Sequence, residues 1–180
     1  MKYSDPDYVL EEFKKLIYEL YEEMQEPTKG IDLNEKKYKS NLGVISNIRV
    51  SDIYCRLSCV IDNINKLKSD VAVENGFDTT DFNYTTHLRG FCNDYQDVIN
   101  IAVSLKQILD QNTGLIGGFL GLFRGYNNPV ETVVNGHVQR MNYQQLHNKF
   151  SYQAALLQES QQNLMKYVAK DIDDYMMNFN

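Results

Sequence analysis

The chain has 180 residues, 43% of them hydrophobic and 23% charged, a composition that provides for one folded core and excludes intrinsic disorder. Its formal net charge of −6 argues against duplex DNA as a partner bound through bulk electrostatics. The three cysteines are an odd number and no apolar signal segment follows the first residues, so we expect reduced thiols and a cytoplasmic location.

The first predicted helix covers residues 5–26. Ser4 or Asp5 can cap it, and Pro6 fits the first turn, where a missing N–H costs nothing. Pro27 then ends the helix. The expected buried positions recur at helical spacing: Val9, Phe13, Leu16, Ile17, Leu20 and Met24.

The next two predicted helices, over residues 35–73 and 81–111, share a heptad pattern in which apolar residues alternate by three and four. Such seams favour an antiparallel pair that crosses at about 20°. The β-branched stretch at 43–50 leaves a break in the first of these helices as an alternative. The seam positions are Val50, Ile53, Leu57, Val60, Ile64, Leu67 and Val71, followed by Tyr84, Leu88, Phe91, Tyr95, Val98, Ala102, Leu105 and Leu109.

A last helix is predicted over residues 129–177, because Asn128 and Pro129 resemble a helix start and the apolar positions that follow have a rough helical period. A bend near Gly136 or Ser151 is an alternative to one straight helix. The apolar positions are Val130, Val134, Val138, Met141, Leu146, Phe150, Leu157, Leu164, Val168 and Ile172.

A glycine-rich apolar connector over residues 114–125 joins the last two predicted helices. Glycines spaced by four allow two helix backbones to approach closely. The segment either folds back to cap the core, or stays exposed and contacts a partner protein or a membrane. The candidate partner- or membrane-binding residues are Leu115, Ile116, Phe119, Leu120, Leu122 and Phe123.

Arg140 and His147 lie seven residues apart in the last predicted helix, which would place them on one helical face. This spacing resembles, over eight residues, that of the helical ribonucleases of the HEPN superfamily. The resemblance implies that the two side chains act together at a phosphodiester. The alternative is that both are ordinary surface or interface residues.

No metal site, cofactor or catalytic residue is predicted. A zinc site can be drawn from Cys55, Cys59, His87 and Cys92, but its spacing matches no zinc module. The sequence also lacks a phosphate-binding glycine loop, a zinc-protease motif and a serine elbow.

Together these patterns predict an all-α fold: an elongated antiparallel bundle of four to five long helices with coiled-coil-like heptad packing, forming one domain over residues 1–180. We expect a non-enzymatic protein-interaction module of the adaptor, inhibitor, immunity or secretion-partner type. It would bind another protein through helical faces, with the apolar segment 114–125 as a further candidate contact. Homo-oligomerisation is open, because such seams also pair between chains. The alternatives are a membrane-active protein that inserts residues 114–125 and a HEPN-like ribonuclease.

Overall fold

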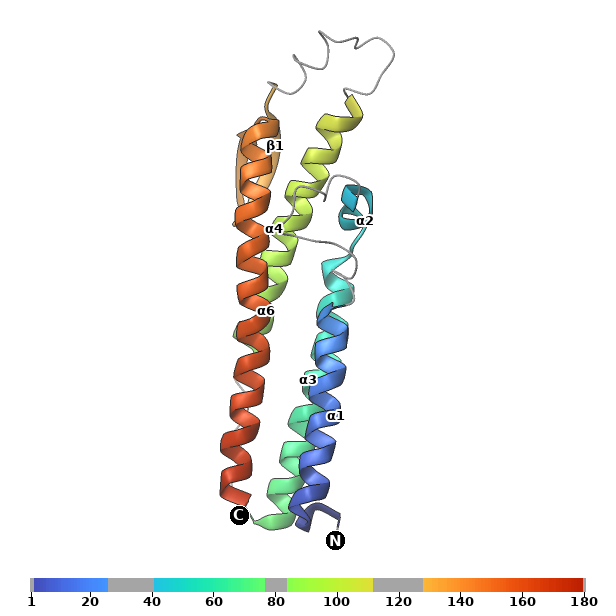
Figure 1. Cartoon of the computed structure of the whole chain (residues 1–180), viewed down its shortest axis with the longest axis vertical. Helices are drawn as coiled ribbons and strands as arrows, with labels where there is room; N and C mark the ends of the chain where they lie inside the picture. Colours follow the sequence, from blue (N-terminus) through green and yellow to red (C-terminus); the bar gives the residue numbers. More distant parts are fainter. Residues whose placement is uncertain (1, 26–40, 77–83, 112–127, 180) are drawn as a thin grey trace. The chain divides into compact units, whose positions relative to one another are not determined.

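The computed structural model describes residues 2–25, 41–76, 84–111 and 128–179. These residues form long α-helices and one β-hairpin (Figure 1), so the predicted all-α helical bundle is confirmed. The heptad geometry of its packing stays a prediction. The chain divides into two compact units, residues 1–29, 51–92 and 160–180 in unit 1 and residues 30–50 and 93–159 in unit 2. The single domain stays a prediction.

Unit 1 is built from α1 (Pro6–Gln25), most of α3 (Val50–Asn75), the start of α4 (Tyr84–Gln111) and the end of α6 (Tyr143–Phe179). A short 3-10 helix, η1 (Lys2–Ser4), precedes α1. Polar contacts fix α3 antiparallel to this N-terminal segment at both ends. The Tyr3 N–H donates to Glu74 Oε2 at 3.2 Å, and Arg56 Nη1 lies 3.3 Å from Glu23 Oε2.

The predicted start of α1 is confirmed. The helix begins at Pro6, and Asp5 Oδ1 accepts a hydrogen bond from the Asp7 N–H at 3.0 Å, which satisfies one of the helix's unpaired first-turn donors.

The core of unit 1 contains the predicted apolar stripes of α1 and α3. Burial of each large aliphatic or aromatic side chain contributes about 1.5–3 kcal/mol, so these stripes hold the unit together. Leu16 and Ile17, predicted with them, are only half-buried. The buried apolar residues of the unit, which come from α1, α3, α4 and α6, are Val9, Phe13, Leu20, Met24, Ile53, Leu57, Val60, Ile61, Ile64, Leu67, Val71, Ala72, Leu88, Phe91, Cys92, Leu164, Val168 and Ile172.

The continuous helix predicted over residues 35–73 is wrong within the described residues, and the alternative break is confirmed. Helix α2 (Leu42–Ser46) ends before residues 47–49, and α3 starts at Val50. The last turn of α2 tightens, because the Asn47 N–H bonds to Val44 O and the Ile48 N–H to Ile45 O, both at 3.2 Å.

The helix predicted over residues 129–177 is wrong in its first part, which forms a hairpin of β1 (Val130–Val134) and β2 (His137–Met141). Asn135 and Gly136 connect the strands with φ values of 53° and 75°. Two consecutive positive φ values define the type I′ turn, which Asn-Gly favours most strongly and whose twist matches that of the strands. The turn chemistry therefore outweighs the approximate helical spacing.

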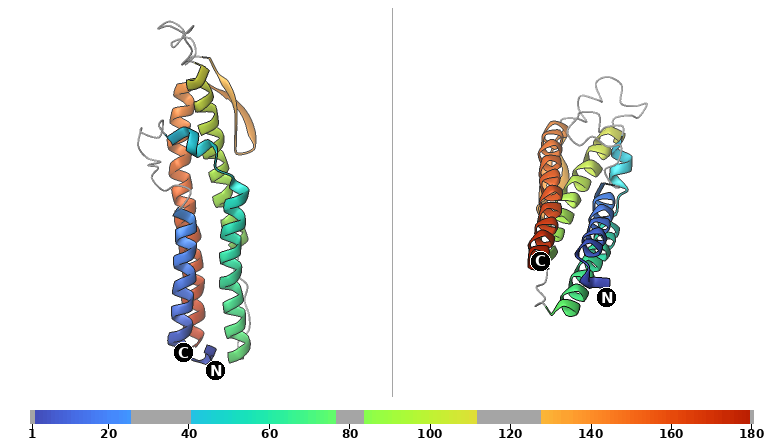
Figure 2. Two further views of the ribbon diagram at one scale, coloured as in Figure 1. Left: turned by 90° about the vertical axis from the view of Figure 1, so that its right-hand side faces the viewer. Right: turned by 60° about the horizontal axis from the view of Figure 1, so that its bottom comes forward.

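In unit 2 the hairpin lies along α4 (Figure 2), and side chains of the helix bond to the outer edge of β1. Asn100 Nδ2 donates to Val133 O at 3.0 Å, and Ser104 Oγ donates to Glu131 O at 3.4 Å. Glu131 and Val133 pair in register with β2 at the non-hydrogen-bonded positions of the ladder, so their carbonyls point away from it. Helix α4 thus satisfies a strand edge that would otherwise need water.

Helix α6 begins directly after the hairpin with a reciprocal cap. The Gln145 N–H donates to Asn142 Oδ1 at 3.0 Å, while the Asn142 N–H donates to Gln145 Oε1 at 2.9 Å. This is the arrangement of a capping box, and it ends the hairpin where the helix begins.

The core of unit 2 lies among α2, α4, the hairpin and the first half of α6. It contains one fully buried amide, Gln153, whose Nε2 and Oε1 have no hydrogen-bond partner among the described residues. The buried apolar residues are Leu42, Ile45, Tyr95, Val98, Ile99, Ile101, Ala102, Leu105, Ile108, Val134, Met141, Leu146, Phe150, Ala154 and Leu157.

Candidate protein-binding site

An apolar groove runs between α1 and α6 within unit 1, with a volume of about 430 Å³. The two helices run antiparallel beside it, and Gln161 Nε2 donates to Met24 O at 3.3 Å just beyond one end. Helix α1 contributes Leu10, Phe13, Lys14, Ile17, Tyr18 and Tyr21 to the wall. Helix α6 contributes Met165, Ala169, Ile172 and Asp173.

The groove exists because small and half-buried residues face each other across the two helices. Ala169 on α6 leaves space that a larger side chain would fill, and Ile17 on α1 is only half-buried. On the α1 side the rim carries Tyr18 and Tyr21, whose exposed fractions are 63% and 49%. Large aromatic side chains left this open to water favour contact with another apolar surface.

Charges in the groove lie toward the N-terminal half of α1. Lys14 Nζ lies 3.2 Å from Glu11 Oε1, an exposed pair one helical turn apart that contributes little to stability. Among the described wall residues, those of the tyrosine half are uncharged. The groove can therefore hold apolar side chains along most of its length and orient them by charge at one end.

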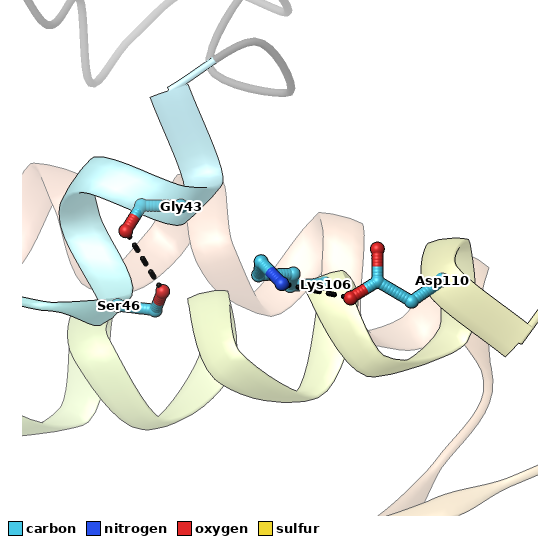
Figure 3. Close-up of polar contacts among 4 residues, drawn as sticks. All are labelled: Gly43, Ser46, Lys106 and Asp110. Carbon is cyan, nitrogen blue, oxygen red and sulfur yellow. Dashed lines mark hydrogen bonds and ion pairs between the residues drawn. The ribbon is translucent and has the colours of Figure 1, made fainter.

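A second hollow, of about 760 Å³, lies in unit 2 between the end of α2 and α4. Figure 3 shows its polar contacts: Lys106 Nζ binds Asp110 Oδ2 at 2.7 Å, and Ser46 Oγ donates to Gly43 O at 3.1 Å. These polar groups already bind residues of the chain itself.

Asp97 is a buried carboxylate beside the hairpin turn, and its Oδ1 accepts the Asn135 N–H at 3.1 Å. Burial raises the pKa of Asp97 above its ordinary value, and the nearby Asp94 carboxylate adds to this rise. The Asn135 hydrogen bond and the Lys149 charge act in the opposite direction. The hydrogen bond from Asn135 to Asp97 holds the turn against α4. When Asp97 is ionised, burial of its charge lowers the stability of the folded chain.

Arg140 and His147 do not share a helical face, so the placement implied by the HEPN resemblance is wrong. Arg140 lies on β2, where it is exposed and paired in register with Glu131, whereas His147 lies in the first turns of α6 beside the Tyr143 ring. The capping box at Asn142 separates the strand from the helix.

The structure does not bring the cysteines and His87 together in one group. Cys55 and Cys59 are exposed on α3, while Cys92 is buried on α4, and burial raises the pKa of the Cys92 thiol to about 11. The His87 ring instead packs against Tyr167, with 4.3 Å between the ring centroids. Within residues 2–25, 41–76, 84–111 and 128–179, no group of three or more His, Cys, Asp or Glu side chains could hold a metal ion.

The predicted binding residues of the connector, Leu115, Ile116, Phe119, Leu120, Leu122 and Phe123, lie outside the described residues. Of the helices that the structure describes, none combines the length and apolar character needed to cross a bilayer.

Comparison with protein-family models, curated proteins and solved structures finds no match for this chain.

The groove was not predicted from the sequence, although a signal for it exists. Tyr18 and Tyr21 follow Lys14 at spacings of four and three, which gives α1 a second stripe beside the one that enters the core. Thirteen tyrosines in the chain obscured this pair.

Proposed function

We propose that this chain is a non-enzymatic protein-interaction module that binds another protein molecule through the groove between α1 and α6. The observation that carries this proposal is an apolar groove with two exposed tyrosines on its rim. Grooves between helices are common sites for apolar partner side chains. Tyrosine is also one of the residues that most often dominate the binding energy of protein interfaces.

The composition of the groove wall supports a binding role. Its charged residues are Lys14 and Asp173, and the other eight described wall residues are uncharged. Shape and apolar contact are what the groove provides.

The connector over residues 114–125 is a second proposed contact with the partner. It carries the most apolar stretch of the sequence, which favours burial against another surface. A Phe119→Ser, Phe123→Ser double variant tests this contact separately from the groove. The variant is compared with the wild type in partner capture and in liposome flotation. If the folded variant still captures the protein partner but no longer floats with liposomes, the connector contacts a membrane.

The groove is tested with a Tyr18→Ala, Tyr21→Ala double variant in affinity capture, with the chain itself included as a candidate partner through two different tags. Both tyrosines are largely exposed, so the variant should fold normally. Tyr152→Ala is the matched control, because Tyr152 is 57% exposed on α6 in unit 2 and away from the groove residues. Capture that survives Tyr152→Ala and is lost in the double variant supports the proposal; capture unchanged by the double variant refutes it.

A further inference from the structure

The two long edges of the hairpin in unit 2 differ in what they contact. On the β1 edge, side chains of α4 bond to the carbonyls of Glu131 and Val133. Their register partners on β2, Arg140 and Val138, also lie at non-hydrogen-bonded positions, so their N–H and C=O groups point away from β1. Among the described residues, none bonds to these main-chain groups of β2. An open strand edge of this kind is a template for pairing with another extended chain.

The open edge of β2 is held in place by contacts that lie elsewhere on the hairpin. At the turn, the Asn135 N–H donates to Asp97 Oδ1 at 3.1 Å, and in β1 the Thr132 hydroxyl donates to Asn100 O at 3.4 Å. Neither contact uses an outward group of β2. Because the edge is already ordered, binding of a partner strand requires little further ordering of this chain.

The exposed face of the hairpin shows which side chains a third strand should carry. Val138 is 66% exposed and lies opposite Val133, which is 40% exposed, while the exposed Arg140 lies opposite Glu131. Within the part of the chain that the structure describes, no ion pair holds the Arg140 guanidinium. A strand on the other side of β2 extends the same two rows of side chains. An apolar residue beside Val138 and a carboxylate beside Arg140 would complete them.

We infer that the open edge of β2 binds an extended segment of another protein, in which an acidic residue stands two positions before a β-branched apolar residue. This surface is separate from the groove of the proposed function. The added strand runs antiparallel to β2, because the exposed face of the sheet stays in water, which is common for antiparallel sheets and rare for parallel ones. In that orientation Val138 and Arg140 each exchange two main-chain hydrogen bonds with the residue opposite.

Strand β1 shows what such a segment looks like. It runs antiparallel to β2, with Glu131 opposite Arg140 and Val133, two positions later, opposite Val138. An end-capped peptide with the sequence of residues 130–134 is therefore a suitable probe for the open edge.

A second copy of the chain does not supply the required strand. Both edges of its β1 are occupied, one by β2 and the other by side chains of α4. Its β2 contains Arg140 and no acidic residue, so pairing between two β2 strands brings no carboxylate to either arginine. Charge therefore favours a different protein as the partner.

The test titrates the isotope-labelled full chain with millimolar concentrations of this peptide and follows the amide resonances by NMR. The resonances of Val138 and Arg140 should shift and saturate, because each N–H gains a hydrogen bond, whereas that of Tyr18 in unit 1 should not move. A peptide in which lysine replaces the glutamate should bind about tenfold more weakly, because a like charge then lies beside Arg140.

Two substitutions in β2 separate main-chain pairing from side-chain contact. Val138→Pro removes an outward N–H and leaves the bonds between β1 and β2 in place, so the Arg140 resonance should no longer shift. Val138→Thr is the matched control, because it keeps the N–H and the branched shape, and its dissociation constant should stay within about threefold of the wild type.

Charge exchange makes the result independent of how well the proline variant folds. Arg140→Glu should bind the glutamate peptide about tenfold more weakly than the wild type does and should bind the lysine peptide as tightly as the wild type binds the original. Recovery with the lysine peptide also shows that this variant is folded.

The inference is overturned if the Val138 and Arg140 resonances do not shift, if the two peptides bind equally, or if binding survives Val138→Pro. It is also overturned if the free chain forms a dimer that Val138→Pro dissociates, because a second copy would then occupy the edge. None of these results bears on capture through Tyr18 and Tyr21, so the proposed function stands or fails separately.

Discussion

Gln153 gives the sharpest stability prediction, because its amide is fully buried and neither polar atom has a hydrogen-bond partner among the described residues. Leaving a buried polar group unpaired costs about 1–3 kcal/mol. Methionine has a similar length, lacks the amide and adapts to irregular space. We therefore expect Gln153→Met to raise the free energy of unfolding by about 1–3 kcal/mol.

The measurement is urea unfolding followed by circular dichroism, supported by thermal melts. A gain of this size raises the melting temperature by about 2–4 °C for each kcal/mol in a chain of this length. The control is Gln162→Met, at an exposed position of the same helix, which should change stability by less than about 0.5 kcal/mol.

The opposite result would refute the reasoning. If Gln153→Met lowers stability by more than about 1 kcal/mol while the slope of the urea transition is unchanged, the amide is making hydrogen bonds in the native protein.

Three further predictions concern single positions. Gly136→Ala should destabilise the protein by about 1 kcal/mol in thermal melts, because φ is +75° at this position. Gly90→Ala, inside α4, should stabilise the protein by a similar amount, because an added Cβ meets no atom there. If both variants change the stability in the same direction by the same amount, the turn assignment is contradicted. Asp97→Asn keeps the acceptor for the Asn135 N–H and removes a carboxyl group whose pKa is raised by burial. Its gain in stability over the wild type should be smallest below the unfolded pKa of about 3.9 and should grow as pH rises through the higher folded pKa. A gain that shrinks as pH rises would be inconsistent with this reasoning. Cys92 should react with a thiol reagent at pH 8 only after unfolding, because its buried thiol has a pKa of about 11. The two exposed cysteines of α3 should react in the native protein. Fast labelling of all three cysteines in the native protein would exclude the burial of Cys92.

The long helices could be predicted because the spacing of their apolar residues fits a helix and does not fit a strand. In α3 the spacing from Ile53 to Val71 alternates by three and four over several turns, a pattern that a strand cannot produce, and these residues are buried. The same reasoning placed Leu88 to Leu105 of α4 correctly.

The hairpin was missed because its spacing is ambiguous. Val130, Val134 and Val138 are four residues apart, and an interval of four lies on one face of a helix and on one face of a strand. Pro129 then suggested a helix start. The information that decides between the two is local: Asn135-Gly136 forms a type I′ turn, which a spacing argument does not weigh.

The α6 side of the candidate site could not be predicted from the sequence, for a different reason. The groove depends on which face of α6 lies beside α1, and Ala169 and Met165 show no distinctive pattern in the sequence. Only the packing of helices distant in the chain turns these residues into a binding surface.

The bonds from α4 to the edge of β1 also bear on the order in which unit 2 folds. The hairpin has a two-residue turn and can close within microseconds, but a two-stranded hairpin alone is marginally stable in water. Its contacts with Asn100 and Ser104 join residues 33 and 27 positions apart. Each closure of such a loop costs entropy before the bonds form. The hairpin should therefore form and unfold repeatedly until α4 has formed. The amide hydrogens of its strands should gain protection from exchange only together with those of that helix.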